Sequence, residues 1–333
     1  MLRLPPFRYI PAHSADEAVA LLADHGADAM PVSGGTDLYA NMKQRLFTPK
    51  VLVGLKPVRN LGFIRYNDVT GLTIGALATL TAVAESDAVL AHYPALARAA
   101  ALISTPQLRN MGTIGGNVCV DTRCNYYNQN LDWRKALGYC MKKDGDICRV
   151  ATSSPKCLAV NSSDTAPVLA AFGARLHIAG PDGEREVPIA EFYVDDGMRA
   201  WSKQPGEIVT RISVPPPRAH TRSSYRKLRL RNSFDFPILA VAAVVRLDDD
   251  GVCREAQLVL NAVAPKPIAV PAAAECLIGS RLESEALEAA ADAAYAAGKP
   301  LDNTSATIPY RKRMLRVFAR RALDDLTHDL TTS

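Results

Sequence analysis

Apolar and polar residues form short runs along the chain, some with helical spacing and some with the spacing of strands. The run 15–25 carries apolar residues at helical intervals, and Ser14 followed by Glu17 has the spacing of a capping box, so a helix is predicted there. A proline in the first turn supports a second predicted helix over 94–103. Short apolar runs between turn residues predict strands at 30–32, 51–55 and 72–76.

The second half of the chain contains a strong hairpin signal and then a change of organisation. Asp182-Gly183 lies between the apolar runs 174–179 and 185–187, which predicts antiparallel strands. Three consecutive prolines at 215–217 cannot continue a helix or a strand, so we place the main boundary there, between 1–217 and 218–333. Beyond it we expect strands at 224–230, 239–247 and 252–260 and helices at 283–297 and 309–326. Because strands and helices do not alternate strictly, the predicted fold class is α+β.

The composition is that of an ordinary soluble protein. The 333 residues are 48% hydrophobic and 22% charged, which is enough apolar surface for two or three packed domains. The net charge of +5 is spread thinly and does not indicate nucleic-acid binding. The N-terminal segment has prolines where a signal peptide needs an apolar core, and no run approaches the ~18–20 apolar residues that span a bilayer. We therefore expect a cytoplasmic protein without a membrane span.

Five of the seven cysteines fall within one 39-residue stretch: Cys119, Cys124, Cys140, Cys148 and Cys157. An odd number of cysteines at uneven spacing argues against a disulfide framework and for reduced thiols. Thiolates are soft ligands that favour zinc or iron-sulfur clusters, and a bound cation relieves the repulsion between them. The stretch therefore predicts a metal or cluster site.

Two glycine loops in the first part could accept a phosphate group. Ser33-Gly34-Gly35-Thr36-Asp37 follows a predicted strand, and residues 107–117 read QLRNMGTIGGN. Glycines let backbone amides approach a pyrophosphate closely, although a plain tight turn explains either loop taken alone. Neither loop has the spacing GxGxxG or GKS/T, so a Rossmann fold and a nucleotide hydrolase are both excluded.

Several motifs occur in a recognisable order: SGGTDL, TIGAL at 73–77, QLRNMGTIGGN, SDTAPVLAAFGA from Ser163 and YRKLRLRNSFDFPILAVAAVV from Tyr225. Together they resemble the FAD-binding subunit of the molybdenum hydroxylase family, over nearly the whole chain. The resemblance implies a two-part FAD-binding domain of the vanillyl-alcohol-oxidase (PCMH) type, followed by a C-terminal α+β flavoprotein domain. The chain shows no Ser-His-Asp arrangement, paired-carboxylate motif or histidine metal site, so we expect its cofactors to do the chemistry and no residue to be catalytic.

The resemblance implies a set of FAD-binding residues: Pro31, Val32, Ser33, Gly34, Gly35, Thr36, Asp37, Leu38, Ile103, Thr113, Ile114, Gly115, Gly116, Asn117, Asp164 and Lys227. The two glycine loops would hold the pyrophosphate. The aspartate of the SD motif would contact the adenosine side, and Ile103 would be an apolar contact. Taken singly, an aspartate like Asp164 is more often a helix cap and a lysine like Lys227 more often a solvated surface residue.

The cysteines lie in an insertion at about 119–159, since 47 positions separate Asn117 from Asp164 where the family has a short turn. Such an insertion resembles that of the flavoprotein (beta) subunit of 4-hydroxybenzoyl-CoA reductases, which carries a [4Fe-4S] cluster. Cys119 follows Asn117 so closely that it should still belong to the flavin scaffold. The expected ligands are therefore Cys124, Cys140, Cys148 and Cys157, with structural zinc as the alternative to a cluster.

The implied role is electron transfer between FAD, the cluster and a molybdenum cofactor in another chain. The resemblance implies a large molybdopterin subunit, a small subunit with two [2Fe-2S] clusters, a dimer of such heterotrimers and a ferredoxin-like electron donor. The reaction would be the reductive removal of a phenolic hydroxyl from an aromatic CoA thioester. One alternative is an ordinary molybdenum hydroxylase with a zinc-binding or docking insertion, and another is a zinc-bound, basic interaction scaffold that is not an enzyme.

Overall fold

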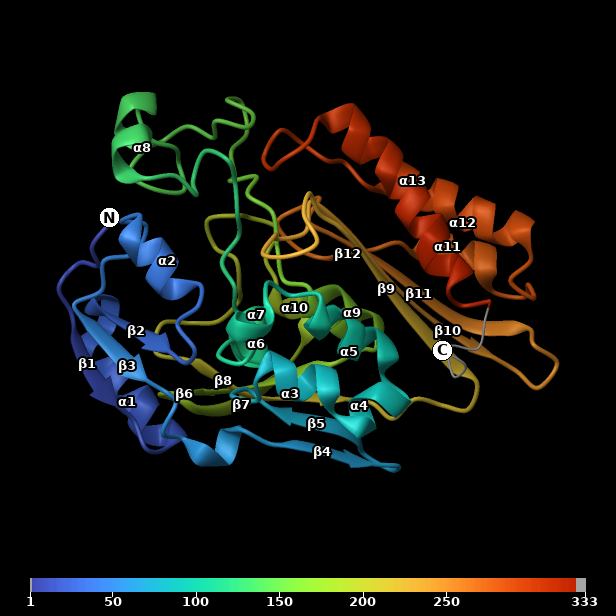
Figure 1. The fold of residues 1–333 in the computed structure, drawn as a ribbon, viewed down its shortest axis with the longest axis horizontal. Coiled ribbons are helices and arrows are strands. Elements are labelled where there is room, and N and C mark those ends of the chain that lie inside the picture. The colour runs from blue at the N-terminus through green and yellow to red at the C-terminus, as the bar shows by residue number, and fades with distance from the viewer. Residues whose placement is uncertain (1, 328–333) are drawn as a thin grey trace.

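A computed structural model describes residues 2–327 of the chain, organised around three sheets. Their strand orders are β1-β3-β2, β4-β5-β8-β6-β7 and β12-β11-β10-β9. The sheets follow one another from the N-terminal to the C-terminal side of the molecule (Figure 1). None of the helices within 2–327 combines the length and apolar character needed to cross a membrane.

The first sheet is parallel and presents the first glycine loop. Helix α1 (Ala15–His25) begins as predicted, with the Ser14 hydroxyl accepting a hydrogen bond from the Glu17 amide at 3.0 Å. Its buried side packs on the strands β1 (Arg8–Pro11), β2 (Ala29–Val32) and β3 (Val51–Gly54). The loop that leaves β2 then leads into helix α2 (Leu38–Lys43). Two short 3-10 turns complete this part, η1 (Gly26–Asp28) and η2 (Arg59–Leu61).

The second sheet is antiparallel and forms one side of the largest core. Its strands are β4 (Ile64–Asn67), β5 (Gly71–Gly75), β6 (Arg175–Gly180), β7 (Gly183–Pro188) and β8 (Ile208–Val214). Short helices pack against it around buried side chains such as Leu72, Ile74 and Leu96. They are α3 (Leu80–Glu85), α4 (Asp87–His92), α5 (Pro94–Ala101), α7 (Ile114–Val118), α9 (Thr165–Ala171) and α10 (Ile189–Phe192). The one-turn helix α6 (Pro106–Arg109) has no buried residue and contacts α3.

The third sheet is buried on both faces. It packs against the second sheet's core on one face and against the C-terminal helices on the other. Alternate residues of its central strand face opposite ways, because side chains alternate along a strand. Ala240 and Ala242 contribute to the core under the second sheet, whereas Val241 and Ala243 pack against the C-terminal helices. The strands are β9 (Thr221–Leu228), β10 (Leu239–Leu247), β11 (Cys253–Asn261) and β12 (Ile268–Ala269), and the helices are α11 (Pro271–Leu277), α12 (Ser284–Ala297) and α13 (Ile308–Asp324).

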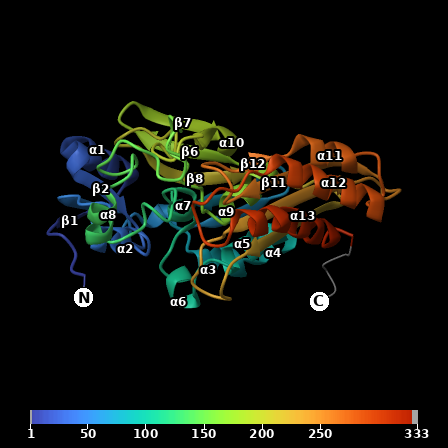
Figure 2. The same ribbon diagram turned by 90° about the horizontal axis from the view of Figure 1, so that it is seen from above.

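The cysteine-bearing insertion lies between α7 and α9 and stands out from the three sheets. Its one helix of more than a turn is α8 (Leu131–Leu137), drawn in green in Figure 1 and seen from above in Figure 2. The outgoing and returning segments pair at Arg123 and Val160, whose backbones exchange two hydrogen bonds of 2.8 Å. The C-terminal domain also contacts it, since Asn303 accepts from the Asn125 amide and donates to the Leu158 carbonyl.

The α+β fold class is confirmed, and most predicted elements lie within a residue or two of their expected bounds. Helix α1 and strand β10 match the predicted ranges. The expected strand at 224–230 lies earlier, at Thr221–Leu228, and the expected helix at 94–103 ends at Ala101. Strand β8 was not predicted, because the polar residues within Ile208–Val214 obscure a run that is central to its sheet.

Arg311 offers a test of how the C-terminal domain is held together. Its side chain is fully buried and donates to the carbonyls of Ile238, Leu301 and Ala262 and to the Asn303 side chain. Replacing it with methionine should lower the free energy of unfolding by at least about 3 kcal/mol, because it leaves four acceptors without their donor and each buried one costs about 1–3 kcal/mol. The measurement is urea unfolding of the purified chain. Arg313→Met, at an exposed position of the same helix, should change the free energy of unfolding by less than about 0.5 kcal/mol. Equal losses in the two variants would show that the buried hydrogen bonds of Arg311 do not stabilise the domain.

Candidate functional site

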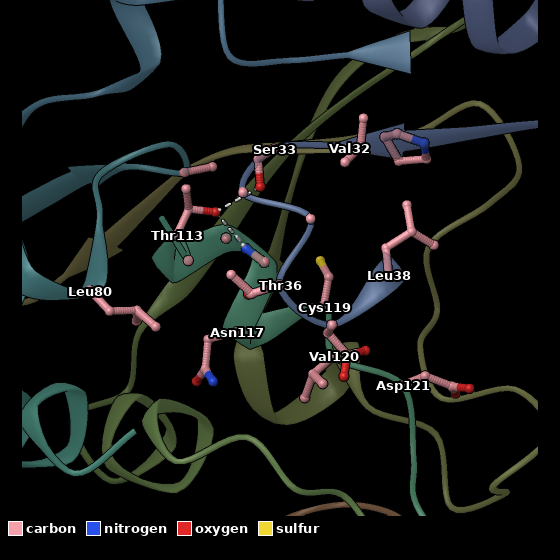
Figure 3. A pocket seen from close by; sticks show the side chains of 18 of the residues that line it. Val32, Ser33, Thr36, Leu38, Leu80, Thr113, Asn117, Cys119, Val120 and Asp121 are labelled. Atoms are coloured by element: carbon pink, nitrogen blue, oxygen red, sulfur yellow. Dashed lines mark hydrogen bonds between the residues drawn. The ribbon is translucent and has the colours of Figure 1, made fainter. Parts of the chain in front are cut away.

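The two glycine loops pack against each other, and both line a cavity of about 510 Å³. The first loop leaves β2 and the second leads into α7, and the hydroxyls of Ser33 and Thr113 lie 3.1 Å apart between them (Figure 3). The Thr113 hydroxyl also accepts a hydrogen bond from the Gly116 amide at 3.1 Å. A cavity of this size is typical of sites for cofactors and drug-sized ligands.

The glycines are required by close packing between the loops. A Cβ at position 34 would lie 1.9 Å from the Met111 carbonyl oxygen, and Gly35 has a φ of +68°, which side chains rarely adopt. A Cβ at position 116 would lie nearest to the Thr113 and Ser33 hydroxyls, at 3.1 and 3.7 Å. Backbone amides at these positions can therefore approach an anionic ligand without an intervening side chain.

All but two of the expected FAD-binding residues line this cavity. Ile114 does not, because its side chain belongs to the core beneath the second sheet. Lys227 also lies outside the lining and reaches the cavity only through Asp164. The structure thus brings together two loops and an aspartate that are distant in sequence.

Asp164 and Lys227 form a buried ion pair at 2.9 Å, with side chains 3% and 1% exposed. The other carboxylate oxygen of Asp164 accepts from the Tyr225 hydroxyl at 2.6 Å, and Lys227 donates to the Leu102 carbonyl. Burial raises the pKa of Asp164 and lowers that of Lys227, and each charge opposes the shift of the other. Asp164 precedes α9 but makes no capping bond with its side chain, and Lys227 is not a solvated surface residue.

Several cavity residues were not anticipated from sequence. Arg123 forms an ion pair with Asp37, and its guanidinium lies 3.7 Å from the centre of the Phe236 ring. The indole nitrogen of Trp201 and Nε of Arg123 are buried donors without a partner among the described residues. Unpaired donors beside a cavity fit a ligand rich in oxygen acceptors, as FAD is. Neither residue belongs to a glycine motif, so only the fold reveals them.

A second, smaller cavity is lined by Cys124, Cys140, Cys148 and Cys157 together. All four are buried, at 8%, 6%, 4% and 5% exposure, and all are free of disulfides. Cys119 lies instead on the first cavity, where Figure 3 shows it beside Val120 and Asp121. The structure thus separates the same four cysteines from the fifth as the sequence analysis does. We call this second space the thiol cavity.

Four buried thiols of this kind are the ligand type for zinc or for an iron-sulfur cluster. Within residues 2–327, no three His, Cys, Asp or Glu side chains are placed to hold a single metal ion. Zinc needs its sulfur ligands about 2.3 Å from one centre, whereas each thiolate of a [4Fe-4S] cluster binds a different iron and the sulfurs can lie farther apart. Burial raises the pKa of Cys124 to about 12 and that of Cys157 to about 11, so ligation would release protons.

The two cavities are neighbours because one short segment contributes to both. Asp121 and Arg123 line the first cavity, and Cys124 lines the thiol cavity. Since an extended chain advances at most about 3.6 Å per residue, the Cα atoms of Asp121 and Cys124 lie within about 11 Å. Electrons could pass between groups held at these two places.

Comparison with known proteins finds relatives that match nearly the whole chain. A family model described as the FAD binding domain in molybdopterin dehydrogenase matches residues 5–217, and one described as the CO dehydrogenase flavoprotein C-terminal domain matches residues 223–326. The carbon monoxide dehydrogenase medium chain of Afipia carboxidovorans is 32% identical over 96% of each chain. The aldehyde oxidoreductase FAD-binding subunit of Escherichia coli is 31% identical over 93% of this chain and 96% of its own.

The fold agrees with these matches. The solved structure of reconstituted CO dehydrogenase from Oligotropha carboxidovorans superimposes with a TM-score of 0.79 at 30% identity, covering 98% of this chain and 99% of the other. The likeness therefore extends over both domains.

Gly116 tests the assignment of the first cavity to FAD. Gly116→Leu should abolish stoichiometric flavin binding, because the leucine side chain would fill part of the cavity that Gly116 lines. The chain should stay folded, because the nearest atoms to the new Cβ are the Thr113 and Ser33 hydroxyls and not backbone. The ratio of flavin absorbance to protein measures the binding. Gly62→Leu is the control, since a Cβ there meets nothing closer than 3.7 Å, and full flavin content in both variants would refute the assignment.

The buried pair makes a separate prediction. Lys227→Met should lower the free energy of unfolding by about 3–5 kcal/mol, because it leaves the Asp164 charge buried without its partner. Adding Asp164→Asn should restore part of the loss, as the uncompensated charge is then removed. Chemical unfolding of the single and double variants measures both effects. A double variant no more stable than Lys227→Met would contradict the explanation that the unpaired Asp164 charge causes the loss.

Proposed function

Because the chain belongs to the FAD-binding subunits of the molybdenum hydroxylase family, we propose that it is the electron-transfer subunit of a 4-hydroxybenzoyl-CoA reductase or a close relative. In this proposal the first cavity holds FAD and the thiol cavity holds a [4Fe-4S] cluster. The subunit passes low-potential electrons toward a molybdenum cofactor in another chain and has no activity alone.

One observation carries the proposal: four buried cysteines from a single insertion converge on the thiol cavity, beside the first cavity, which we call the flavin pocket from here on. A docking loop or a plain surface insertion has no need to bury four free thiols together. The insertion between 119 and 159 also carries seven Lys or Arg against four Asp, a local excess of three positive charges. A four-thiolate cluster is a net anion, so this excess favours its binding.

The residues of this chain bind and orient the cofactors rather than perform chemistry. When bound, FAD exchanges one or two electrons and a cluster exchanges one at a time. The glycine loops present amides to a pyrophosphate, and Asp164 is held in place by Tyr225 and Lys227. Tyr126, Tyr127 and Met141 help to line the thiol cavity.

The proposed partners supply the remaining parts. A large subunit would hold molybdopterin and the substrate, and a small subunit would hold two [2Fe-2S] clusters, in a dimer of heterotrimers. A ferredoxin-like donor would deliver electrons. Removing the phenolic hydroxyl of an aromatic CoA thioester as water consumes two electrons and two protons, so the donor is needed to balance the reaction.

A second candidate is the flavin subunit of an ordinary molybdenum hydroxylase, with electrons leaving through FAD. The names of the relatives favour it, since they include carbon monoxide dehydrogenase and aldehyde oxidoreductase. In that case the insertion would bind zinc or dock a partner.

Iron and acid-labile sulfide analysis of the anaerobically purified chain separates the two candidates. We expect about four iron and about four sulfide per chain, with an electron paramagnetic resonance signal after dithionite reduction. Cys148→Ser should lose most of both, because it removes one of the four thiols of the cavity.

Two variants serve as controls for the ligand set. Cys119→Ser and Cys276→Ser should keep the full iron content, since neither residue lines the thiol cavity. Flavin with zinc and no cluster signal would refute the leading proposal and support the second candidate. Iron lost from Cys119→Ser but retained in Cys148→Ser would refute the choice of ligands.

A further inference from the structure

A buried lysine lies in the lining of the thiol cavity and is not one of its ligands. Lys142 comes two residues after Cys140, and its side chain is only 5% exposed. Burying an ammonium group costs several kcal/mol unless it is paired and hydrogen-bonded. The contacts of this group are therefore informative.

The Lys142 ammonium has a full set of acceptors. It donates to the Asp121 carboxylate at 2.8 Å, to the Thr122 hydroxyl at 2.6 Å and to the Gly197 carbonyl. An ammonium carries three protons, so these three acceptors satisfy it completely. It also lies 4.8 Å from the centre of the Tyr127 ring, another residue of the thiol cavity. The group is fixed in position as a cation.

The partner of this cation faces the other cavity. Asp121 lines the flavin pocket, where Figure 3 shows its side chain, and it also accepts from the Tyr127 hydroxyl at 3.1 Å. The Lys142–Asp121 pair thus joins the linings of the two cavities, with Lys142 on the thiol cavity and Asp121 on the flavin pocket. A pair that only fastened the insertion would not need a buried lysine in the lining that the four cysteines share.

We propose that Lys142 is a positioning residue that sets the reduction potential of the cluster held by the four thiols, with Asp121 moderating its charge. This inference rests on the proposed function. Reduction adds one negative charge to a centre that is already anionic, and a fixed cation in a water-poor site stabilises that charge. Removing the cation makes the cluster harder to reduce, and removing the anion makes it easier.

The test compares neighbouring lysines in the full chain, purified without oxygen. Lys142→Met removes the buried charge and keeps much of the length, and Lys142→Arg keeps the charge. Lys143→Met is the matched control, because Lys143 is 33% exposed and its nearest carboxylate, on Asp144, lies 3.7 Å away. Iron and sulfide are measured first, and the midpoint potential follows from a redox titration monitored by electron paramagnetic resonance.

Lys142→Met should keep its iron and lower the potential by at least about 59 mV, which is a tenfold change in the ratio of reduced to oxidised cluster. Lys142→Arg keeps the charge, so its midpoint potential should stay close to that of the unsubstituted chain. Lys143→Met should change the potential by less than about a third of the change in Lys142→Met. A cluster retained at an unchanged potential in Lys142→Met would overturn the inference and leave the proposed function intact.

Asp121→Asn decides the matter if Lys142→Met fails to assemble a cluster. It keeps the lysine and removes the opposing charge, so the potential should rise, and a retained cluster with an unchanged or lower potential would overturn the inference. An unsubstituted chain without iron and sulfide would overturn both the inference and the proposed function.

Discussion

The placement of the two cavities depends on the hydrogen bonds that the side-chain amide of Asn117 accepts. Its oxygen accepts hydrogen bonds from the Ser163 hydroxyl at 2.8 Å, the Thr165 hydroxyl at 2.8 Å and the Thr165 amide at 3.2 Å. These bonds join the end of the second glycine loop to the start of α9, so the chain leaves and re-enters the scaffold at one place. Since loop closure costs grow slowly with length, a long insertion can be added there without disturbing the flavin pocket.

The C-terminal domain supplies a second set of contacts with the insertion. The Asn261 amide group donates to the Asn161 side chain and to the Ser163 carbonyl, where the insertion ends. Asn303, which accepts from Arg311, contacts the backbone beside Cys124 and Cys157. Buried polar groups must be paired, so these bonds resist separation of the insertion from the domain. Two of the four cysteines are thus positioned by residues far from them in sequence.

Local signals in the sequence predicted the parts of the fold that local physics decides. The cap at Ser14 and the hairpin at Asp182-Gly183 both appear where expected, because each depends only on nearby residues. The glycine loops were identified for the same reason. What sequence could not supply were pairings across the fold, such as Arg123 with Asp37 or Tyr225 with Asp164. The spacing of the cysteines likewise could not show that four of them line one cavity and that Cys119 lies on the other.

The insertion is more informative about the function of this chain than the scaffold that it shares with its relatives. The scaffold resembles relatives whose names refer to carbon monoxide, aldehydes and other substrates, so a flavin pocket alone indicates electron transfer without a direction. The insertion adds four thiols and a buried lysine beside that pocket. In electron transfer the order of potentials decides the direction of flow. Charges such as those of Lys142 and Asp121, held where water is scarce, are a means by which a protein sets that order.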